Sequence, residues 1–354
     1  MLNIYQLLIL NSHNNITDIK WPCLRFNPGF FLANFIHAIK KFDIMSKSIN
    51  RRKFFTDTSL SAAGILLGST LTGAASEREP DASSFDVMKE VMRYRKIDAH
   101  CHPDTDLGKQ LDMADRLGIR WLQISMPVTN FSGTDPEGPE QVRANNNIVI
   151  KAMKEYPDRF VGFFTLNPAY PGESLEEMKR CVDQGMAGYK GYTQVKVNDP
   201  LYYPIIEKLI DLKMIVFMHG FCQLGMAGYR MKYDIGRFPH TTIPEDMAEA
   251  AKRYPEAMFH FAHIAGGGDW EYECKTFRDY PNIYVDTGGS NNEENIIDFA
   301  IRYLGEDRIL FGTDECYHHG VGKILASNAT EAQKKKIFFD NYNNLLRKGG
   351  HHVA

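Results

Sequence analysis

The amino-acid sequence predicts a (β/α)8 barrel of the TIM-barrel class. From about Ser76 onward, short runs rich in Val, Ile, Phe and Tyr alternate with longer amphipathic segments, as strands and helices do. Eight such pairs fit residues 76–354, close to the ~250 residues typical of this barrel. Polar residues follow several strands, at the end where such barrels carry active sites. A doubly wound open sheet is the alternative, but the sequence lacks the Gly-x-Gly-x-x-Gly loop it would need after an early strand.

The individual elements follow from apolar periodicity and from glycine and proline at their ends. After a short helical segment, Phe85–Arg95, we predict strands at Lys96–His102, Ile119–Met126, Phe160–Leu166, Gly188–Tyr192, Met214–His219, Met258–His263, Ile283–Asp286 and Ile309–Gly312. We predict helices at Leu107–Leu117, Gln141–Tyr156, Ser174–Gln184, Leu201–Leu212, Pro244–Tyr254, Trp270–Asp279, Glu293–Leu304 and Glu331–Lys348.

Two long loops interrupt this alternation, Pro127–Glu140 and Gly220–Thr242. Long loops without secondary structure in a compact domain are usually lids or binding loops. The second loop contains Arg230 and Arg237, which are candidates for binding an anionic substrate. A solvated lid surface accounts for these arginines equally well.

Residues 45–76 have the composition of an export signal. The basic stretch that contains Arg51 and Arg52 precedes an uncharged run, which ends in small residues. The arginine pair favours the twin-arginine export machinery as a partner and a periplasmic location. The alternative is an ordinary signal or anchor that happens to contain Arg-Arg, since Asn50, Phe55 and Thr56 depart from the usual motif. Because Met45 would give a normal start, we interpret residues 1–44 as a non-native upstream extension and residues 77–354 as the mature barrel. The uncharged run is too short for a stable membrane anchor.

Charge and cysteine content narrow the function classes. The formal net charge is −3, and residues 1–75 carry +5 (eight Lys/Arg, three Asp), so the remainder carries −3 − 5 = −8. An acidic body argues against nucleic-acid binding. The partner we expect is a small-molecule substrate. The six cysteines are scattered without Cys-x-x-Cys spacing, which argues against a disulfide framework. A homo-oligomer is compatible with the sequence.

Five polar side chains follow apolar strands that are far apart in the sequence. His100 and His102 end the first strand and share a face, because side chains alternate with a period of two. His219, His263 and Asp314 follow the fifth, sixth and eighth strands. Each alone could be a buried core histidine, a helix cap or an ordinary strand-end carboxylate. Together at one barrel mouth, three imidazoles and one carboxylate suit one divalent metal, best Zn²⁺, with Mn²⁺ or Fe²⁺ also acceptable.

The sequence resembles the amidohydrolase superfamily, in particular the amidohydrolase-2 branch that includes aminocarboxymuconate-semialdehyde decarboxylase, over roughly residues 96–348. The matching motifs are Ile-Asp-Ala-His-Cys-His, Gly-Tyr-Lys-Gly-Tyr, Phe-Met-His-Gly, Phe-Ala-His-Ile-Ala-Gly-Gly and Leu-Phe-Gly-Thr-Asp, with Asn-Tyr-Asn-Asn-Leu-Leu near the end. The resemblance implies a barrel of the metal-dependent-hydrolase type. It implies that His100, His102, His219 and Asp314 bind the metal and that His263 is the acid–base or polarising residue.

Lys190 of the fourth strand has two interpretations under this resemblance. Binuclear amidohydrolases use a carboxylated lysine on this strand to bridge two metal ions. In the amidohydrolase-2 branch the matching lysine does not usually bridge. Lys190 would then offset acidic groups in the barrel interior.

The first functional expectation is hydrolysis of an amide, ester or lactone by metal-activated water, with Asp314 taking a proton from that water. The alternative, also implied by the resemblance, is non-oxidative decarboxylation of a small carboxylic acid. A third reading is a catalytically inactive ligand-binding barrel. The motif does not specify the substrate.

Overall fold

The structure is a computed structural model that describes residues 86–127, 137–220, 240–264, 266, 268–289, 291 and 293–353. The predictions for residues 1–44 and 45–76, including twin-arginine export, lie outside the described residues and stay predictions. The same holds for Arg230 and Arg237.

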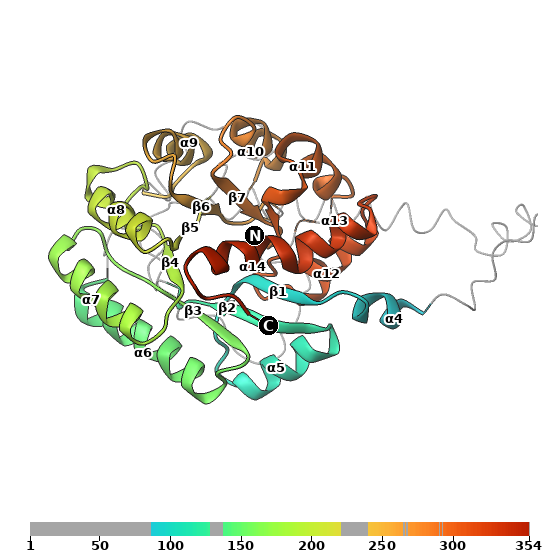
Figure 1. The fold of residues 1–354 in the computed structure, drawn as a ribbon, viewed down its shortest axis with the longest axis horizontal. Helices are drawn as coiled ribbons and strands as arrows, with labels where there is room; N and C mark the ends of the chain where they lie inside the picture. The colour runs from blue at the N-terminus through green and yellow to red at the C-terminus, as the bar shows by residue number, and fades with distance from the viewer. Residues whose placement is uncertain are drawn as a thin grey trace, which may run out of the picture. The chain divides into compact units, whose positions relative to one another are not determined.

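Eight parallel strands form one nearly closed sheet in the order β1 to β8, which confirms the predicted (β/α)8 barrel (Figure 1). The strands are β1 Lys96–Cys101, β2 Ile119–Ile124, β3 Phe160–Phe164, β4 Gly188–Gly191, β5 Ile215–Met218, β6 Met258–Phe261, β7 Ile283–Asp286 and β8 Ile309–Leu310. Two hydrogen bonds connect β1 to the segment after β8. The amide of Ala99 donates to the carbonyl of Phe311, and that of Asp314 donates to the carbonyl of His100, both at 2.8 Å.

Helices surround the strands, and several begin with proline or a capping carboxylate. The α-helices are α4 Val87–Met92, α5 Leu107–Arg116, α6 Pro139–Glu155, α7 Pro171–Asp183, α8 Tyr203–Asp211, α9 Pro244–Arg253, α10 Trp270–Phe277, α11 Ile296–Leu304, α12 Tyr317–Ala326, α13 Glu331–Lys335 and α14 Asn341–Lys348. Short helical turns lie at η2 Pro200–Tyr202 and η5 Glu306–Arg308. No helix within the described ranges is long and apolar enough to cross a membrane.

Side-chain alternation divides the apolar core into two clusters. On β5, Ile215 and Phe217 belong to the cluster inside the barrel, whereas Val216 and Met218 pack in the larger cluster between strands and helices. On β4, Tyr189 faces outward, and its hydroxyl lies 3.0 Å from that of Tyr202. Because neighbouring side chains of a strand face opposite sides, Lys190, the next residue on β4, points into the barrel.

The C-terminal part differs from the prediction of one helix over Glu331–Lys348. That stretch consists of α13, a π-helical segment (η6, Lys336–Asp340) and α14. In Figure 1, α14 crosses the middle of the ring of strands. Tyr342 of α14 joins the cluster inside the barrel. The helix that follows β8 in the barrel is α12, which the sequence analysis missed because its two glycines lower its helix propensity.

Candidate metal centre

The side chains of His100, His102 and Asp314 lie together at the carboxyl ends of β1 and β8. Asp314 Oδ1 is 3.5 Å from His100 Nε2 and 3.4 Å from His102 Nε2. One ligand atom from each residue lies within 4.8 Å of the others. Ligand atoms that are about 2.0–2.2 Å from a shared zinc ion lie roughly 3–3.5 Å from each other. The spacing of the three side chains therefore fits one ion between them.

His263 completes this group from the opposite side of the carboxylate. Its Nε2 is 3.6 Å from Asp314 Oδ2. Its backbone has a φ of 61°, and that of Asp314 is 49°, in the left-handed region that few residues other than glycine adopt. Such conformations cluster at functional sites, where the surrounding contacts hold them in place.

Hydrogen bonds fix the ring orientation of all three histidines in the same way. Nδ1 of His100 donates to Asp286 Oδ2 (3.1 Å), Nδ1 of His102 to the Ser125 carbonyl (2.7 Å), and Nδ1 of His263 to the Gly220 carbonyl (3.3 Å). Because carboxylate and carbonyl oxygens only accept, Nδ1 carries the proton in each of these bonds, and Nε2 of each ring lies toward Asp314.

Burial favours the neutral form of the His100 and His263 rings. The pKa of His100 falls to about 3, first because burial disfavours the charged ring and second because Lys190 is close. Burial likewise lowers the pKa of His263. Nitrogen lone pairs that point at a carboxylate repel its negative charge. A divalent cation between them removes this repulsion by binding both. The donor set therefore fits the metal site expected from the sequence.

His219 is separated from the group of His100, His102 and Asp314 by the ring of His263, which it contacts. Its ring centroid is 4.7 Å from that of His263, edge to face, and it stacks on Tyr192 at 5.9 Å. Burial, followed by the nearby His263, lowers its pKa well below the usual range. His219 is thus in the same buried corner, and its role as a fourth ligand stays a prediction.

Lys190 points into the barrel beneath this group. Its Nζ lies 3.3 Å from His100 Nε2 and 3.4 Å above the centre of the Phe217 ring. Burial lowers the pKa of Lys190 to about 7, against the charges of Asp286 and Asp314, which raise it. The charges of Asp286 and Asp314 act on Lys190 under either interpretation, so both interpretations stay predictions.

Sequence reasoning missed Asp286 and His260. Asp286 ends β7, is fully buried, and accepts hydrogen bonds from His100 Nδ1 and from His260 Nε2 (2.9 Å). Asp286 carries the same signal as the predicted ligands, a polar residue at the end of an apolar strand. His260 lies within β6, where alternation alone places it inside the barrel.

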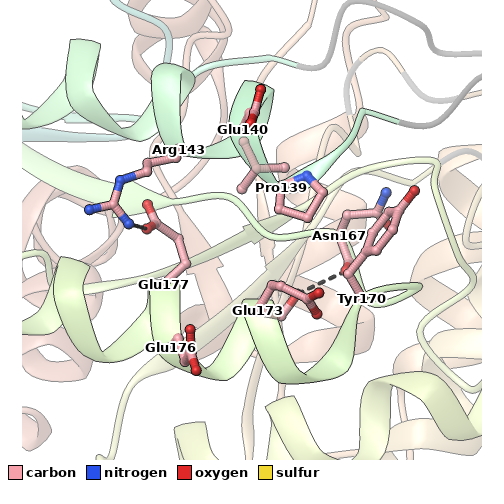
Figure 2. A pocket seen from close by; sticks show the side chains of 10 residues that line it. Pro139, Glu140, Arg143, Asn167, Tyr170, Glu173, Glu176 and Glu177 are labelled. Carbon is pink, nitrogen blue, oxygen red and sulfur yellow. Dashed lines mark hydrogen bonds and ion pairs between the residues drawn. The ribbon is translucent and has the colours of Figure 1, made fainter.

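A pocket of about 180 Å³ lies elsewhere, beside the starts of α6 and α7 (Figure 2). Its charged lining is mostly acidic, and Arg143 faces Glu177 across it at 3.4 Å. Glu177 also accepts hydrogen bonds from Asn146 and Arg180. None of the strand-end histidines lines this pocket. The contacts of Glu177 with Arg143 and Asn146 connect α6 to α7 beside it.

Comparison with known proteins adds a family match. A model of the Amidohydro_2 family, described as amidohydrolase, matches residues 97–344, which include every residue of the candidate centre.

Several of the similar proteins are decarboxylases. A 2-amino-3-carboxymuconate-6-semialdehyde decarboxylase of Dictyostelium discoideum is 22% identical over 68% of this chain and 74% of its own length. A gamma-resorcylate decarboxylase of Rhizobium sp. is 25% identical over 68% of this chain and 87% of its own. The structure of a dihydroxybenzoic acid decarboxylase of Polaromonas sp., solved with bound manganese and 2-nitroresorcinol, superposes with a TM-score of 0.56 and 18% identity. The superposition covers 72% of this chain and 97% of that protein.

These relatives correct the first functional expectation. Hydrolysis of an amide, ester or lactone is the wrong reading, because the similar proteins are mainly decarboxylases. The physical reason for the error is that both reactions use the same donor atoms to place a divalent ion next to a polarised oxygen.

Proposed function

The chain belongs to the amidohydrolase family, and on that premise we propose that it is a metal-dependent, non-oxidative decarboxylase of a small carboxylic acid. The observation that carries the metal dependence is the convergence of three imidazole Nε2 atoms on the Asp314 carboxylate. The choice of decarboxylation over hydrolysis rests on the relatives.

His100, His102 and Asp314 would hold one divalent ion, with His219 as the fourth ligand. When bound, the ion withdraws charge from a substrate oxygen and so lowers the barrier to forming negative charge on the adjacent carbon framework. Imidazole and carboxylate ligands accept Mn²⁺ as well as Zn²⁺, and the manganese in the Polaromonas relative supports testing both.

The residues of the chain supply the proton. In decarboxylation the bond between the carboxylate and its carbon breaks, CO₂ leaves, and the electron pair stays on that carbon. One proton must then replace the lost group. We assign the delivery of this proton to His263, whose Nε2 beside Asp314 Oδ2 would take it from solvent water and pass it to the carbon. Because Nδ1 of His263 is bound to the Gly220 carbonyl, the ring keeps its orientation while Nε2 gains and loses the proton.

The proposal is tested with the purified chain stripped of metal and reloaded with Mn²⁺ or Zn²⁺. A panel should contain 2,6-dihydroxybenzoate, 5-carboxyvanillate and 2-amino-3-carboxymuconate semialdehyde, together with esters, lactones and amides of similar size. We expect CO₂ release from at least one carboxylate, in equal amount to the substrate consumed. Turnover of an ester, lactone or amide without CO₂ release, and of no carboxylate, would refute the proposal.

A further inference from the structure

One fully buried carboxylate, that of Asp286 at the end of β7, contacts two separate parts of the site. Its Oδ2 accepts from His100 Nδ1 at 3.1 Å and from His260 Nε2 at 2.9 Å. Its Oδ1 accepts from the backbone amides of Gly288 at 2.7 Å and His263 at 3.3 Å. Four donors from β1, β6 and the segments that follow β6 and β7 thus meet on one side chain.

We propose that Asp286 is the positioning residue that sets the ring of His100 and the backbone of His263 at the same time. His100 is a proposed metal ligand and His263 the proposed proton donor. The Asp286 carboxylate would therefore orient both the metal-binding residue and the proton-transferring residue. The inference rests on the metal site of the proposed function. It does not depend on the substrate or on the direction of the reaction.

Both carboxylate oxygens of Asp286 act as hydrogen-bond acceptors. A carboxylate offers acceptor positions only, and here every direction is met by an N–H group. An Asn side chain would present an NH₂ group either to the two ring N–H groups or to the two backbone amides. If it faces the rings, His100 must move its proton to Nε2, which removes the lone pair that a metal would use.

His260 holds the Asp286 carboxylate through its Nε2, which donates to Oδ2 at 2.9 Å. Its ring stacks on Phe217 with centroids 3.7 Å apart and planes 5° from parallel. Phe217 in turn meets the ring of His100 edge to face at 4.8 Å. The position of Asp286 is therefore set by a packed aromatic layer inside the barrel, as expected for a residue that orients its neighbours rather than reacting itself.

The test compares Asp286→Asn with a matched control, Asp98→Asn. Asp98 is also fully buried, and it accepts hydrogen bonds from the backbone amides of His100 (3.0 Å) and Thr313 (2.9 Å) and from the Thr313 hydroxyl (2.5 Å). Among the described residues, no ring nitrogen donates to it. The affinity of the metal-free proteins for Mn²⁺ and Zn²⁺ is measured by competition with a chelator. We expect a loss of about 10–100-fold for Asp286→Asn, as for other residues that orient metal ligands, and a much smaller loss for Asp98→Asn.

Equal losses in the two variants, or wild-type affinity in Asp286→Asn, would overturn the inference. A second measurement covers the case in which Asp286→Asn does not fold. Nitrogen NMR of the metal-free wild-type protein should find the proton of His100 on Nδ1, and a proton on Nε2 would overturn the inference. If the wild-type protein binds neither metal, the proposed function fails, while the NMR result still decides the role of Asp286.

Discussion

The backbone of His263 has a conformation that costs free energy. A non-glycine residue at a φ of 61° costs about 1–3 kcal/mol relative to ordinary backbone. The amide of His263 donates to Asp286, and its Nδ1 donates to the Gly220 carbonyl, so contacts at both ends of the residue offset this cost. The conformation turns Nε2 toward Asp314, where the chemistry is proposed to occur.

His263→Asn tests this residue without changing its backbone, because Asn tolerates the left-handed region better than most residues. We expect the metal to remain bound and kcat to fall by about 10²–10⁴-fold, the loss typical of a general acid–base residue. Metal content, melting temperature and kcat should be measured on one preparation. An unchanged kcat at full metal occupancy would remove His263 from the mechanism.

The residues of the candidate metal centre could be found from their positions at strand ends, whereas their side-chain orientations come from the structure. His100, His102, His263 and Asp314 could be predicted because each follows an apolar strand, and parallel strands end at one rim of the barrel. Which ring nitrogen carries the proton depends on partners distant in sequence, such as Asp286. A single sequence contains no record of those contacts.

At the scale of elements, the close approach of β7, β8 and β1 depends on Gly312. A Cβ at this position would lie 2.9 Å from Asp286 Cβ and 3.0 Å from His100 Cβ. Such distances leave no room for a methyl group, because both neighbours are fully buried. The glycine of Leu-Phe-Gly-Thr-Asp thus lets the end of β8 pass directly beside the metal site.

Gly312→Ala should therefore destabilise the protein by about 1–3 kcal/mol through overpacking. It should also weaken metal binding, because relief of the contact displaces His100 or Asp286. Gly322→Ala in α12 is the matched control, since a Cβ there meets nothing within 4 Å and alanine favours a helix. The two are compared by thermal unfolding and chelator competition. Equal stability of both variants would contradict this role of Gly312.

Lys323 connects α12 to the segment after β7. Its Nζ donates to the carbonyls of Thr287 (3.0 Å) and Gly289 (2.6 Å). Burial lowers its pKa from 10.5 to about 8. Between these two pH values the unfolded chain binds more protons than the folded chain. The titration of Lys323 therefore increases the free energy of unfolding as the pH rises from about 8 to 10.5.

Lys323→Met removes that titration while keeping most of the side-chain volume. We expect the wild type to gain stability relative to the variant between about pH 8 and pH 10.5, by at most about 1.4 kcal/mol per pH unit. Denaturant unfolding of both proteins across this range measures the difference, in which the titration of other groups largely cancels. A difference that stays constant with pH would mean that Lys323 titrates alike in the folded and unfolded states.

The elements found from the sequence are those with strong periodicity. All eight strands were located, because buried parallel strands read as apolar runs. The helix α12 was missed, since its sequence Tyr-His-His-Gly-Val-Gly-Lys contains two poor helix formers and is stabilised by packing on the barrel. The π-helical segment between α13 and α14 gives no local signal either.

For the whole molecule, the fold and the candidate metal site do not by themselves distinguish hydrolysis from decarboxylation. The same barrel and the same imidazole and carboxylate donors serve hydrolysis and decarboxylation, because both need a divalent ion beside a polarised oxygen. Sequence reasoning therefore reached the correct fold and placed hydrolysis first wrongly. The distinction lies in the substrate-binding side chains, for which the sequence offered only Arg230 and Arg237 in a long loop.

The most direct test of the central claim is the CO₂ balance of one reaction followed with and without metal. The metal-loaded protein should release one CO₂ for each carboxylate consumed. That release should stop when a chelator removes the ion and return when Mn²⁺ or Zn²⁺ is restored. Consumption of substrate without CO₂, or CO₂ release that the chelator does not affect, would contradict the account.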